Sequence, residues 1–177
     1  MVLETPRLRL RELRAEDAAQ LAELFADRVV MAHYWNFLPP EASVNWAATH
    51  ARLYETHGYA PWTVELRDGT FVGQCGPLPQ SLDGRDEVEI VCFLLRPFWR
   101  EGYADEACRA AMDFAFELIG VDRVVAMIFP ANRPSIRLAL RCGFAYERDV
   151  IRDGLVMKLY TAGRASLEEA PRARVGP

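Results

Sequence analysis

The sequence predicts a single α+β domain whose core is a mixed, mostly antiparallel, twisted sheet. Two observations carry this prediction. Three apolar and aromatic segments, separated by short glycine-containing turns, follow one another between residues 59 and 95, as in an antiparallel run of strands. Segments with helical periodicity precede this run and alternate with the apolar segments that follow it. We expect about seven strands flanked by about four helices.

Length and composition fit one globular domain. The chain has 177 residues, of which 51% are hydrophobic and 26% charged, which is ordinary for a protein that buries its own core. A net charge of -4 argues against a chain built to neutralise nucleic-acid phosphates. The first residues lack the apolar run of a signal peptide, and no segment approaches membrane-spanning length. We therefore expect a cytoplasmic protein that binds neither nucleic acid nor membrane.

The cysteines indicate no disulfide framework. Cys75, Cys92, Cys108 and Cys142 form no C-x-x-C pair, and each lies among apolar neighbours in the sequence. A thiol in such a setting packs as a small hydrophobic group. No spacing of His, Cys and carboxylate residues is typical of a metal site. We expect reduced thiols and no metal ion.

The N-terminal part of the chain predicts one strand and two helices. Residues 7–13 alternate polar and apolar side chains, as in a half-buried edge strand. Residues 15–27 show helical periodicity, with acidic side chains in the first turn where the helix dipole favours them. A second helical pattern covers residues 41–56 and ends at a His-Gly pair.

Three strands are expected in the centre of the chain. Residues 59–66 and 70–78 are separated by an Arg-Asp-Gly turn, and residues 86–95 lie beyond an Asp-Gly turn. Short turns of this composition connect antiparallel neighbours.

A long helical pattern begins after Gly102 and lasts until Gly120. Downstream, the sequence predicts a buried strand, a short helix with an asparagine cap and a closing hairpin, over residues 123–129, 132–142 and 143–160. Residues 1–160 are therefore expected to form the domain. Residues 161–177 contain few large apolar side chains, so we expect a flexible tail there.

Gly102 stands between a charged turn and the long helix, and two interpretations are open. The first N–H groups of a helix lack internal partners and carry partial positive charge, so small residues at Gly102 and Ala104 would let a phosphate lie against the backbone. The glycine could instead serve only the strand-to-helix turn. The pattern is neither a P-loop nor a dinucleotide fingerprint, because the further glycines and the Lys-Ser/Thr pair are missing.

The segment WREGYA, residues 99–104, resembles the Q/R-x-x-G-x-G/A motif with which GNAT-superfamily N-acetyltransferases hold the pyrophosphate of coenzyme A. Residues 88–95, VEIVCFLL, resemble the fourth strand of that fold, and residues 132–144 resemble its later N-x-x-A/S…GF segment. The opening residues 3–21 and the strands that follow resemble the RimJ/RimL-like subgroup, which acetylates protein N-termini and other amines. The resemblance covers residues 3–160.

The resemblance implies a GNAT-like fold whose sheet is splayed between its fourth and fifth strands, with the pantetheine of acetyl-CoA in the gap. It implies coenzyme contacts along the strand edge, in the turn and at the later helix, by Phe93, Leu94, Leu95, Arg100, Glu101, Gly102, Tyr103, Ala104, Asn132 and Ser135. Trp99 stands at the usual Gln/Arg position of the motif. The Glu101 carboxylate would repel a pyrophosphate unless it turns outward or Arg100 offsets it.

Glu89 matches the position of a glutamate that serves several family members as general base. Strand alternation places it on one face with Val91 and Phe93, so its carboxylate would run toward an apolar region that raises its pKa. The alternative is a solvated glutamate paired across the strand with an arginine. Where many members have a tyrosine acid this chain has Ala139, so Tyr103, Ser135, a water or simple thiolate departure would serve instead.

The segment MAHYWNF, residues 31–37, matches the part of the family that forms the acceptor wall. We expect His33, Tyr34 and Trp35 to contact the acceptor, and His33 is a second candidate base. The alternative is that the aromatic residues pack as core. His50 and His57 are expected on helix surfaces.

These observations predict an acyltransferase that moves the acetyl group of acetyl-CoA to a primary amine by direct attack in a ternary complex. The amine would be a protein N-terminus, or alternatively a small molecule such as a polyamine, amino acid or antibiotic. A non-catalytic acyl-CoA-binding module is the alternative outside enzymes. A homodimer is possible, and the expected ligands are acetyl-CoA and the amine, with no metal.

Overall fold

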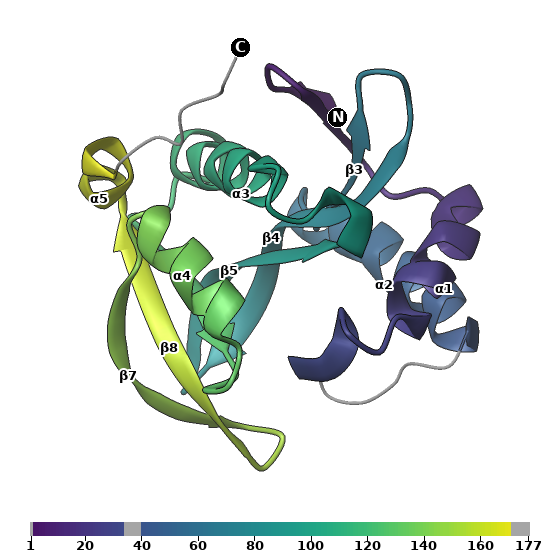
Figure 1. Ribbon diagram of the computed structural model, residues 1–177. Coiled ribbons are helices and arrows are strands. Elements are labelled where there is room, and N and C mark those ends of the chain that lie inside the picture. Colours follow the sequence, from purple (N-terminus) through teal and green to yellow (C-terminus); the bar gives the residue numbers. More distant parts are fainter. Residues whose placement is uncertain (1, 34–39, 171–177) are drawn as a thin grey trace.

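The computed structural model describes residues 2–33 and 40–170. One sheet forms the centre of the molecule, in the strand order β1-β2-β3-β4-β5-β6-β8-β7 (Figure 1). The strands are β1 (Val2–Glu4), β2 (Leu8–Arg11), β3 (Trp62–Leu66), β4 (Phe71–Leu82), β5 (Arg85–Leu94), β6 (Arg123–Ile128), β7 (Ala145–Arg152) and β8 (Leu155–Gly163). Every neighbouring pair is antiparallel except β5 and β6, which are parallel. The predicted mixed, mostly antiparallel sheet is confirmed.

Helices cover both faces of the sheet (Figure 1). They are α1 (Ala18–Ala26), α2 (Pro40–His57), α3 (Tyr103–Phe114), α4 (Arg133–Arg141) and α5 (Arg164–Glu169). A π-helical turn, Ala115–Ile119, extends α3 to Gly120, whose left-handed conformation ends the helix. Apolar side chains of α1 and α2 pack in one cluster with Phe71 and Phe93, and those of α3 and α4 pack with the opposite sheet face. The domain is therefore a helix–sheet–helix sandwich.

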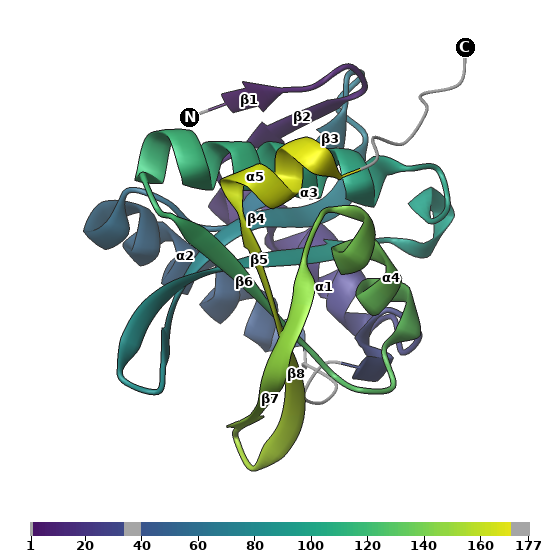
Figure 2. The ribbon, with the colours of Figure 1, turned by 90° about the vertical axis from the view of Figure 1, so that its left-hand side faces the viewer.

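β5 and β6 separate soon after they meet. β4 and β5 are paired along their whole length, from Leu82 opposite Arg85 to Gly73 opposite Leu94. In contrast, Glu89 opposite Val125 is the single matched pair between β5 and β6, and the two strands diverge beyond it (Figure 2). These are the fourth and fifth strands of the sequence prediction, so the predicted splay is confirmed.

The C-terminal region differs from the flexible tail expected over residues 161–177. β8 runs on to Gly163, where it pairs with Arg123 of β6, and α5 follows with a buried Leu167. The helix lies so close to Gly143 that a Cβ there would come within 2.3 Å of the Ser166 carbonyl oxygen. Small and polar residues therefore form structure here because β6 and Gly143 provide surfaces for them. The last seven residues lie outside the described part of the chain.

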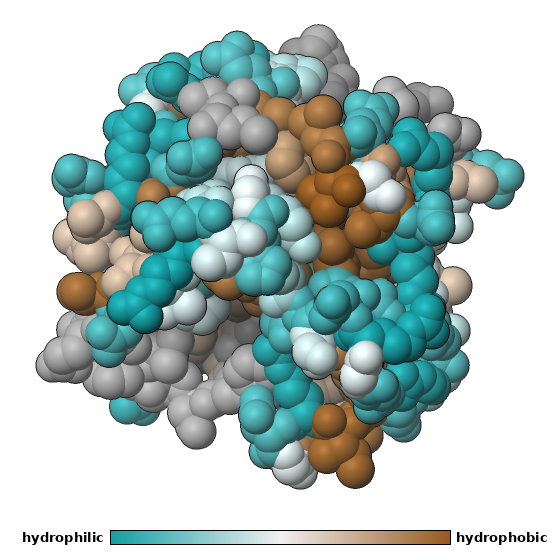
Figure 3. All heavy atoms as spheres, turned by 180° about the vertical axis from the view of Figure 1, so that it is seen from behind, coloured by the Kyte–Doolittle hydropathy of each residue, from teal (hydrophilic) through white to brown (hydrophobic). Residues whose placement is uncertain are grey.

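The edge of the sheet also differs from the expectation. Residues 7–13 were expected to contribute an edge strand, yet β2 pairs with β3 on one side and with β1 on the other. β1 has only three residues, too few to show a periodic pattern. At the other end of the sheet the β7–β8 hairpin exposes Ile151, Leu155 and Val156, where Figure 3 shows apolar surface at the lower edge of the molecule.

Candidate active site

A cavity of about 490 Å³ passes through the gap between β5 and β6. Its walls come from both faces of the sheet and from the strands between them. The helices α1 and α2 and the turn between them contribute Phe25, Met31, His33, Trp46 and His50, the strands contribute Glu89, Val91, Cys92, Phe93 and Met127, and the α4 side contributes Asn132, Ser135, Leu138, Ala139 and Cys142. One cavity thus joins the expected coenzyme side to the expected acceptor side.

The turn before α3 contains two residues with positive φ, a left-handed conformation that glycine adopts more readily than other residues. Gly102 is the N-cap of α3 at φ +82°, and its carbonyl accepts the N–H of Glu106 at 3.1 Å. Arg100 also has a positive φ, of 68°, although its side chain makes that conformation costly. The side chains of Arg100 and Glu101 are exposed, while Tyr103 and Ala104 are half-buried. The five predicted turn residues therefore form one compact strand-to-helix connection.

Arg7 holds this turn, a role that sequence reasoning missed. Its Nη1 donates to the Glu101 carbonyl at 2.7 Å, its Nε donates to the Glu106 carboxylate at 2.7 Å, and its guanidinium lies 4.6 Å from the Tyr103 ring centroid. Arg7 is distant in sequence, so no local motif points to it. It places a positive charge beside the α3 N-terminus, where the expected pyrophosphate would meet the Glu101 carboxylate.

Every second residue along β5 directs its main-chain N–H toward the gap between β5 and β6. Leu95 donates its N–H to the Val72 carbonyl at 2.9 Å, so its main chain points to β4. Main-chain N–H groups alternate in direction along a strand, so Phe93 also points to β4, whereas Cys92 and Leu94 point to the gap. The Leu94 carbonyl accepts the indole N–H of Trp99 at 2.7 Å. Of the three residues expected to bind pantetheine through their backbone, only Leu94 has a suitable N–H direction.

Glu89 lies in the wall of the cavity and is 5% exposed. Its carboxylate accepts from Arg152 of β7 at 3.0 Å and from the Met127 N–H at 3.3 Å. Burial raises the pKa of Glu89, and the charge of Arg152 opposes that rise. The carboxylate is buried, as the first interpretation expects, and is paired with an arginine, as the alternative expects. Its role as general base stays a prediction.

The acceptor side of the cavity contains aromatic and histidine side chains. His33 stacks on Phe129 with ring centroids 6.3 Å apart. Tyr34 and Trp35, the other two residues predicted to contact the acceptor, lie outside the described residues. Trp46 of α2 lines the cavity, and its indole N–H donates to Gln74 at 2.9 Å.

His50 was expected on a helix surface, and this was wrong. It is 2% exposed, lines the cavity and lies 4.5 Å from the Trp46 ring. Its Nδ1 lies 2.7 Å from the Trp46 carbonyl, while its Nε2 is buried without a hydrogen-bond partner among the described residues. Burial lowers the pKa of His50, which favours a neutral imidazole. The spacing of Trp46 and His50 by one helical turn was the available signal.

The start of α4 combines its capping role with a place in the cavity wall. The Asn132 side chain accepts the N–H of Ser135 at 3.2 Å, as the sequence predicted for an N-cap. Asn132 is buried, and both residues line the cavity. Ala139 lies one turn further along the same wall, so this position offers no hydroxyl group for proton transfer.

The comparisons with known proteins agree with this geometry. The family model described as "Acetyltransferase (GNAT) domain" matches residues 7–145. The chain belongs to the GNAT family of acetyltransferases. It is 35% identical over 150 residues to the uncharacterized protein YkkB of Bacillus subtilis. The aligned region covers 84% of this chain and 87% of that protein.

Two further proteins resemble this chain, one in sequence and one in fold. It is 30% identical to the uncharacterized N-acetyltransferase YoaA of Bacillus subtilis, over 82% of this chain and 84% of that protein. RimJ of Mycobacterium smegmatis, solved in complex with CoA-disulfide, superposes with a TM-score of 0.74 at 21% identity, covering 92% of this chain and 85% of that one. GNAT enzymes use acetyl-CoA, and this chain is an acetyl-CoA-dependent N-acetyltransferase.

The residues present fit that cosubstrate. The half-buried N-terminus of α3, which Arg7 holds in place, and the gap-facing edge of β5 supply main-chain hydrogen-bonding groups on the coenzyme side of the cavity. Among the described residues, no helix is long and apolar enough to cross a membrane.

Proposed function

We propose that the protein acetylates a primary amine at a protein N-terminus, by direct attack of the amine on acetyl-CoA within a ternary complex. The cavity between β5 and β6 is the observation that carries this proposal. Because its walls come from both sheet faces, a donor entering past α4 and an acceptor entering past α2 would meet beside Glu89. A covalent enzyme intermediate is not required.

On the coenzyme side, the turn at Gly102 holds the pyrophosphate and the edge of β5 binds the pantetheine. Main-chain N–H groups of Gly102, Tyr103 and Ala104 supply the donors, Arg7 holds the turn through the Glu101 carbonyl, and Arg100 offsets the Glu101 carboxylate. Leu94 donates its N–H in the gap and thereby also polarises the thioester carbonyl. Asn132 and Ser135 contact the pantetheine from the opposite wall.

Proton transfer from the amine has two candidate acceptors in the cavity. Glu89 is the first, because its buried carboxylate has a raised pKa and lies at the narrow end of the gap. His50 is the second, because its buried imidazole has a lowered pKa and a ring nitrogen without a partner among the described residues. The thiolate leaves either unassisted or with a proton from Tyr103, Ser135 or water, since Ala139 cannot supply one.

The acceptor assignment rests on the RimJ/RimL-like resemblance and on the apolar wall formed by Phe25, Met31, Trp46 and His33. Such a wall suits the first side chain of a peptide better than a polycation such as a polyamine, because Glu89 is the one carboxylate among the described residues that line the cavity. His33 lies where the acceptor enters, and Tyr34 and Trp35 follow it in the sequence.

The test has two stages. Calorimetric titration with acetyl-CoA first measures coenzyme binding, and thiol release is then followed with N-terminal peptides, polyamines, amino acids and aminoglycosides. Peptide-dependent thiol release supports the proposal. Thiol release with small amines but not with peptides would mean that the acceptor is a small molecule. Tight acetyl-CoA binding without thiol release by any amine would mean that the protein is a non-catalytic acyl-CoA-binding module.

A further inference from the structure

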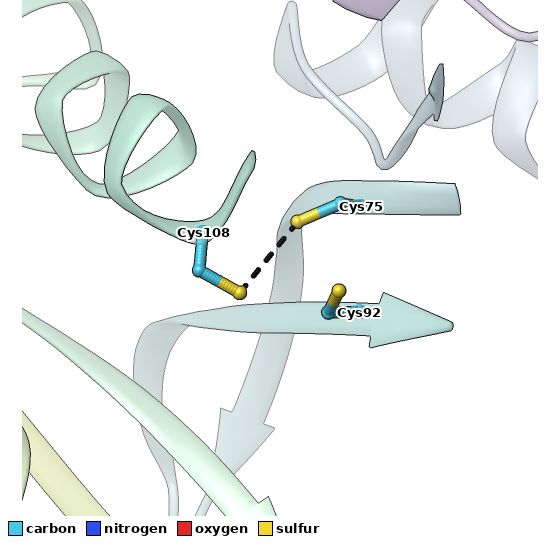
Figure 4. A group of neighbouring side chains, drawn as sticks. All are labelled: Cys75, Cys92 and Cys108. Carbon is cyan, nitrogen blue, oxygen red and sulfur yellow. Dashed lines mark hydrogen bonds between the residues drawn. The ribbon is translucent and has the colours of Figure 1, made fainter. Parts of the chain in front are cut away.

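Three of the four cysteines meet where β4, β5 and α3 pack together (Figure 4). The Sγ atoms of Cys75, Cys92 and Cys108 all lie within 4.8 Å of one another, and those of Cys75 and Cys108 are 3.8 Å apart. The residues are 17 and 16 positions apart in sequence, which matches no metal-binding spacing. Only the fold brings them together.

The backbone fixes each sulfur from a different direction. Cys75 and Cys92 stand directly opposite each other on antiparallel strands, so their side chains leave the same face of the sheet. Cys108 reaches this face from the second turn of α3. Cys75 and Cys108 are buried, and Cys92 is half-buried. Because two strands and a helix hold the three thiols in place, little reorganisation would be needed to use them together.

The sulfur spacing suits a metal with thiolate ligands. Zinc binds cysteine sulfur at about 2.3 Å with tetrahedral geometry, which puts neighbouring sulfurs about 3.8 Å apart. The Sγ atoms of Cys75 and Cys108 are 3.8 Å apart, which equals this value, and both lie within 4.8 Å of the Cys92 sulfur.

The group of three sulfurs also borders the cavity. Cys92 and Cys108 line its wall, so an ion can reach the sulfurs from that side, and a water in the cavity can fill a fourth coordination position. A second consequence depends on the proposed function. An ion bound here would lie beside the path expected for the pantetheine, because the Cys92 main chain faces the same gap.

We propose that Cys75, Cys92 and Cys108 bind one thiophilic cation of the Zn²⁺ class as thiolates, and that this ion and acetyl-CoA compete for the cavity. Binding releases the thiol protons and changes no oxidation state. The first part of the proposal concerns the thiols alone and does not depend on acetyl transfer.

Titration of the reduced, metal-free full-length chain with Cd²⁺ tests the first part, because each Cd²⁺–thiolate bond absorbs in the ultraviolet. We expect an absorbance endpoint at one Cd²⁺ per chain and displacement of the ion by excess Zn²⁺. Cys92→Ser, Cys75→Ala and Cys108→Ala should each weaken Cd²⁺ binding by about 10²-fold or more. The comparison variant is Cys142→Ala, which removes the thiol that neighbours Cys108 but does not belong to the group of three. It should keep the endpoint at one Cd²⁺ per chain, and loss of the endpoint would make Cys142 a fourth ligand in place of water.

Circular dichroism establishes that each variant is folded, and Cys92→Ser changes the half-buried member of the group with the least disturbance. The proposal of a metal site is overturned if the wild type shows no endpoint at one equivalent, or if the folded Cys92→Ser variant binds Cd²⁺ as tightly as wild type. Competition is measured separately, by acetyl-CoA titration with and without one equivalent of Zn²⁺. Equal acetyl-CoA affinity with and without Zn²⁺ would refute only the competition between the ion and acetyl-CoA. If the metal-free protein did not bind acetyl-CoA, the proposed function would be refuted and the metal site would not.

Discussion

Gly102 has two independent reasons to be glycine. Its φ of +82° is strained for any other residue, and a Cβ there would lie 3.1 Å from the Arg7 guanidinium. We predict that Gly102→Val removes measurable acetyl-CoA binding in a calorimetric titration, because the branched side chain displaces Arg7 and covers the α3 N-terminus. Gly58→Val is the matched control, since Gly58 has φ +78° with open space around it. That variant should lose similar stability and keep acetyl-CoA affinity, and equal affinity in both variants would contradict the prediction.

Substitutions of Glu89 and Glu87 can distinguish a catalytic role from a purely structural one. Both are buried on the same face of β5, and each is paired with an arginine, Glu89 with Arg152 and Glu87 with Arg123. Only Glu89 lines the cavity. We predict that Glu89→Gln lowers kcat/KM by about 10²-fold, measured by thiol release, while Glu87→Gln changes it little. An unchanged rate and pH profile in Glu89→Gln would transfer the role of base to His50.

His50 links stability to pH. Burial lowers its pKa in the folded state, so the unfolded chain binds the proton more readily as the pH falls below the ordinary histidine value of about 6.5. We predict that this residue makes the free energy of unfolding decrease between pH 7 and the lowered pKa. Urea denaturation at several pH values should show a smaller decrease in His50→Gln than in wild type, and the exposed His57 provides the control substitution. A steeper dependence in the His50 variant would refute this.

At the scale of elements, a buried charge network joins the start of α1 to the sheet. Asp17 accepts from Arg11 at 2.7 Å and from Thr63 at 2.9 Å, and Arg11 also pairs with Glu65. Although burial by itself would raise the pKa of Asp17, the hydrogen bonds from Arg11, Arg14 and Thr63 hold it below the ordinary value. Its contribution is therefore present at neutral pH and is lost as the pH falls through the lowered pKa.

We predict that Asp17→Ala lowers the free energy of unfolding by about 3 kcal/mol, because it leaves the largely buried Arg11 charge with one partner fewer. Chemical denaturation at pH 7 measures the change. Glu4→Ala removes one partner of the exposed Arg67 pair and should lower the free energy of unfolding far less, because solvent screens exposed charges. Similar losses in the two variants would mean that burial does not determine the value of these pairs.

The elements that the sequence predicted correctly are those whose signals are local. The turns at Gly69, Gly84 and Gly154 need positive φ and occur between alternating segments, so the hairpins were predictable. The long helix was predictable from its periodic apolar face, and Asn132 from its capping pattern. β1 and α5 were not predictable in this way, because each is short and is stabilised by a distant partner rather than by its own pattern.

The residues of the candidate site also fall into those with local sequence signals and those without. Gly102, Glu89 and the α4 residues lie in segments whose motifs identified them before the fold was known. Arg7, His50 and the group of three cysteines became visible only when distant segments met, since their roles depend on contacts about 100 residues away or on burial within the assembled cavity. At the level of the molecule, the oligomeric state stays open between monomer and homodimer, and sedimentation velocity can distinguish them.

The single matched pair between β5 and β6 also has a consequence for the dynamics of the whole molecule. The main-chain ladder is continuous from β1 to β5 and again from β6 to β8, but Glu89 and Val125 alone connect the two by matched pairing. We predict that amide hydrogens in the two ladders exchange with deuterium as two cooperative units of different protection, and that acetyl-CoA slows exchange in both, which mass spectrometry can measure. Uniform protection across all eight strands would show that α3, whose apolar side chains share one core cluster with residues of both ladders, already makes them one unit. In that case a helix, and not strand pairing, would make the two parts of the sheet unfold together.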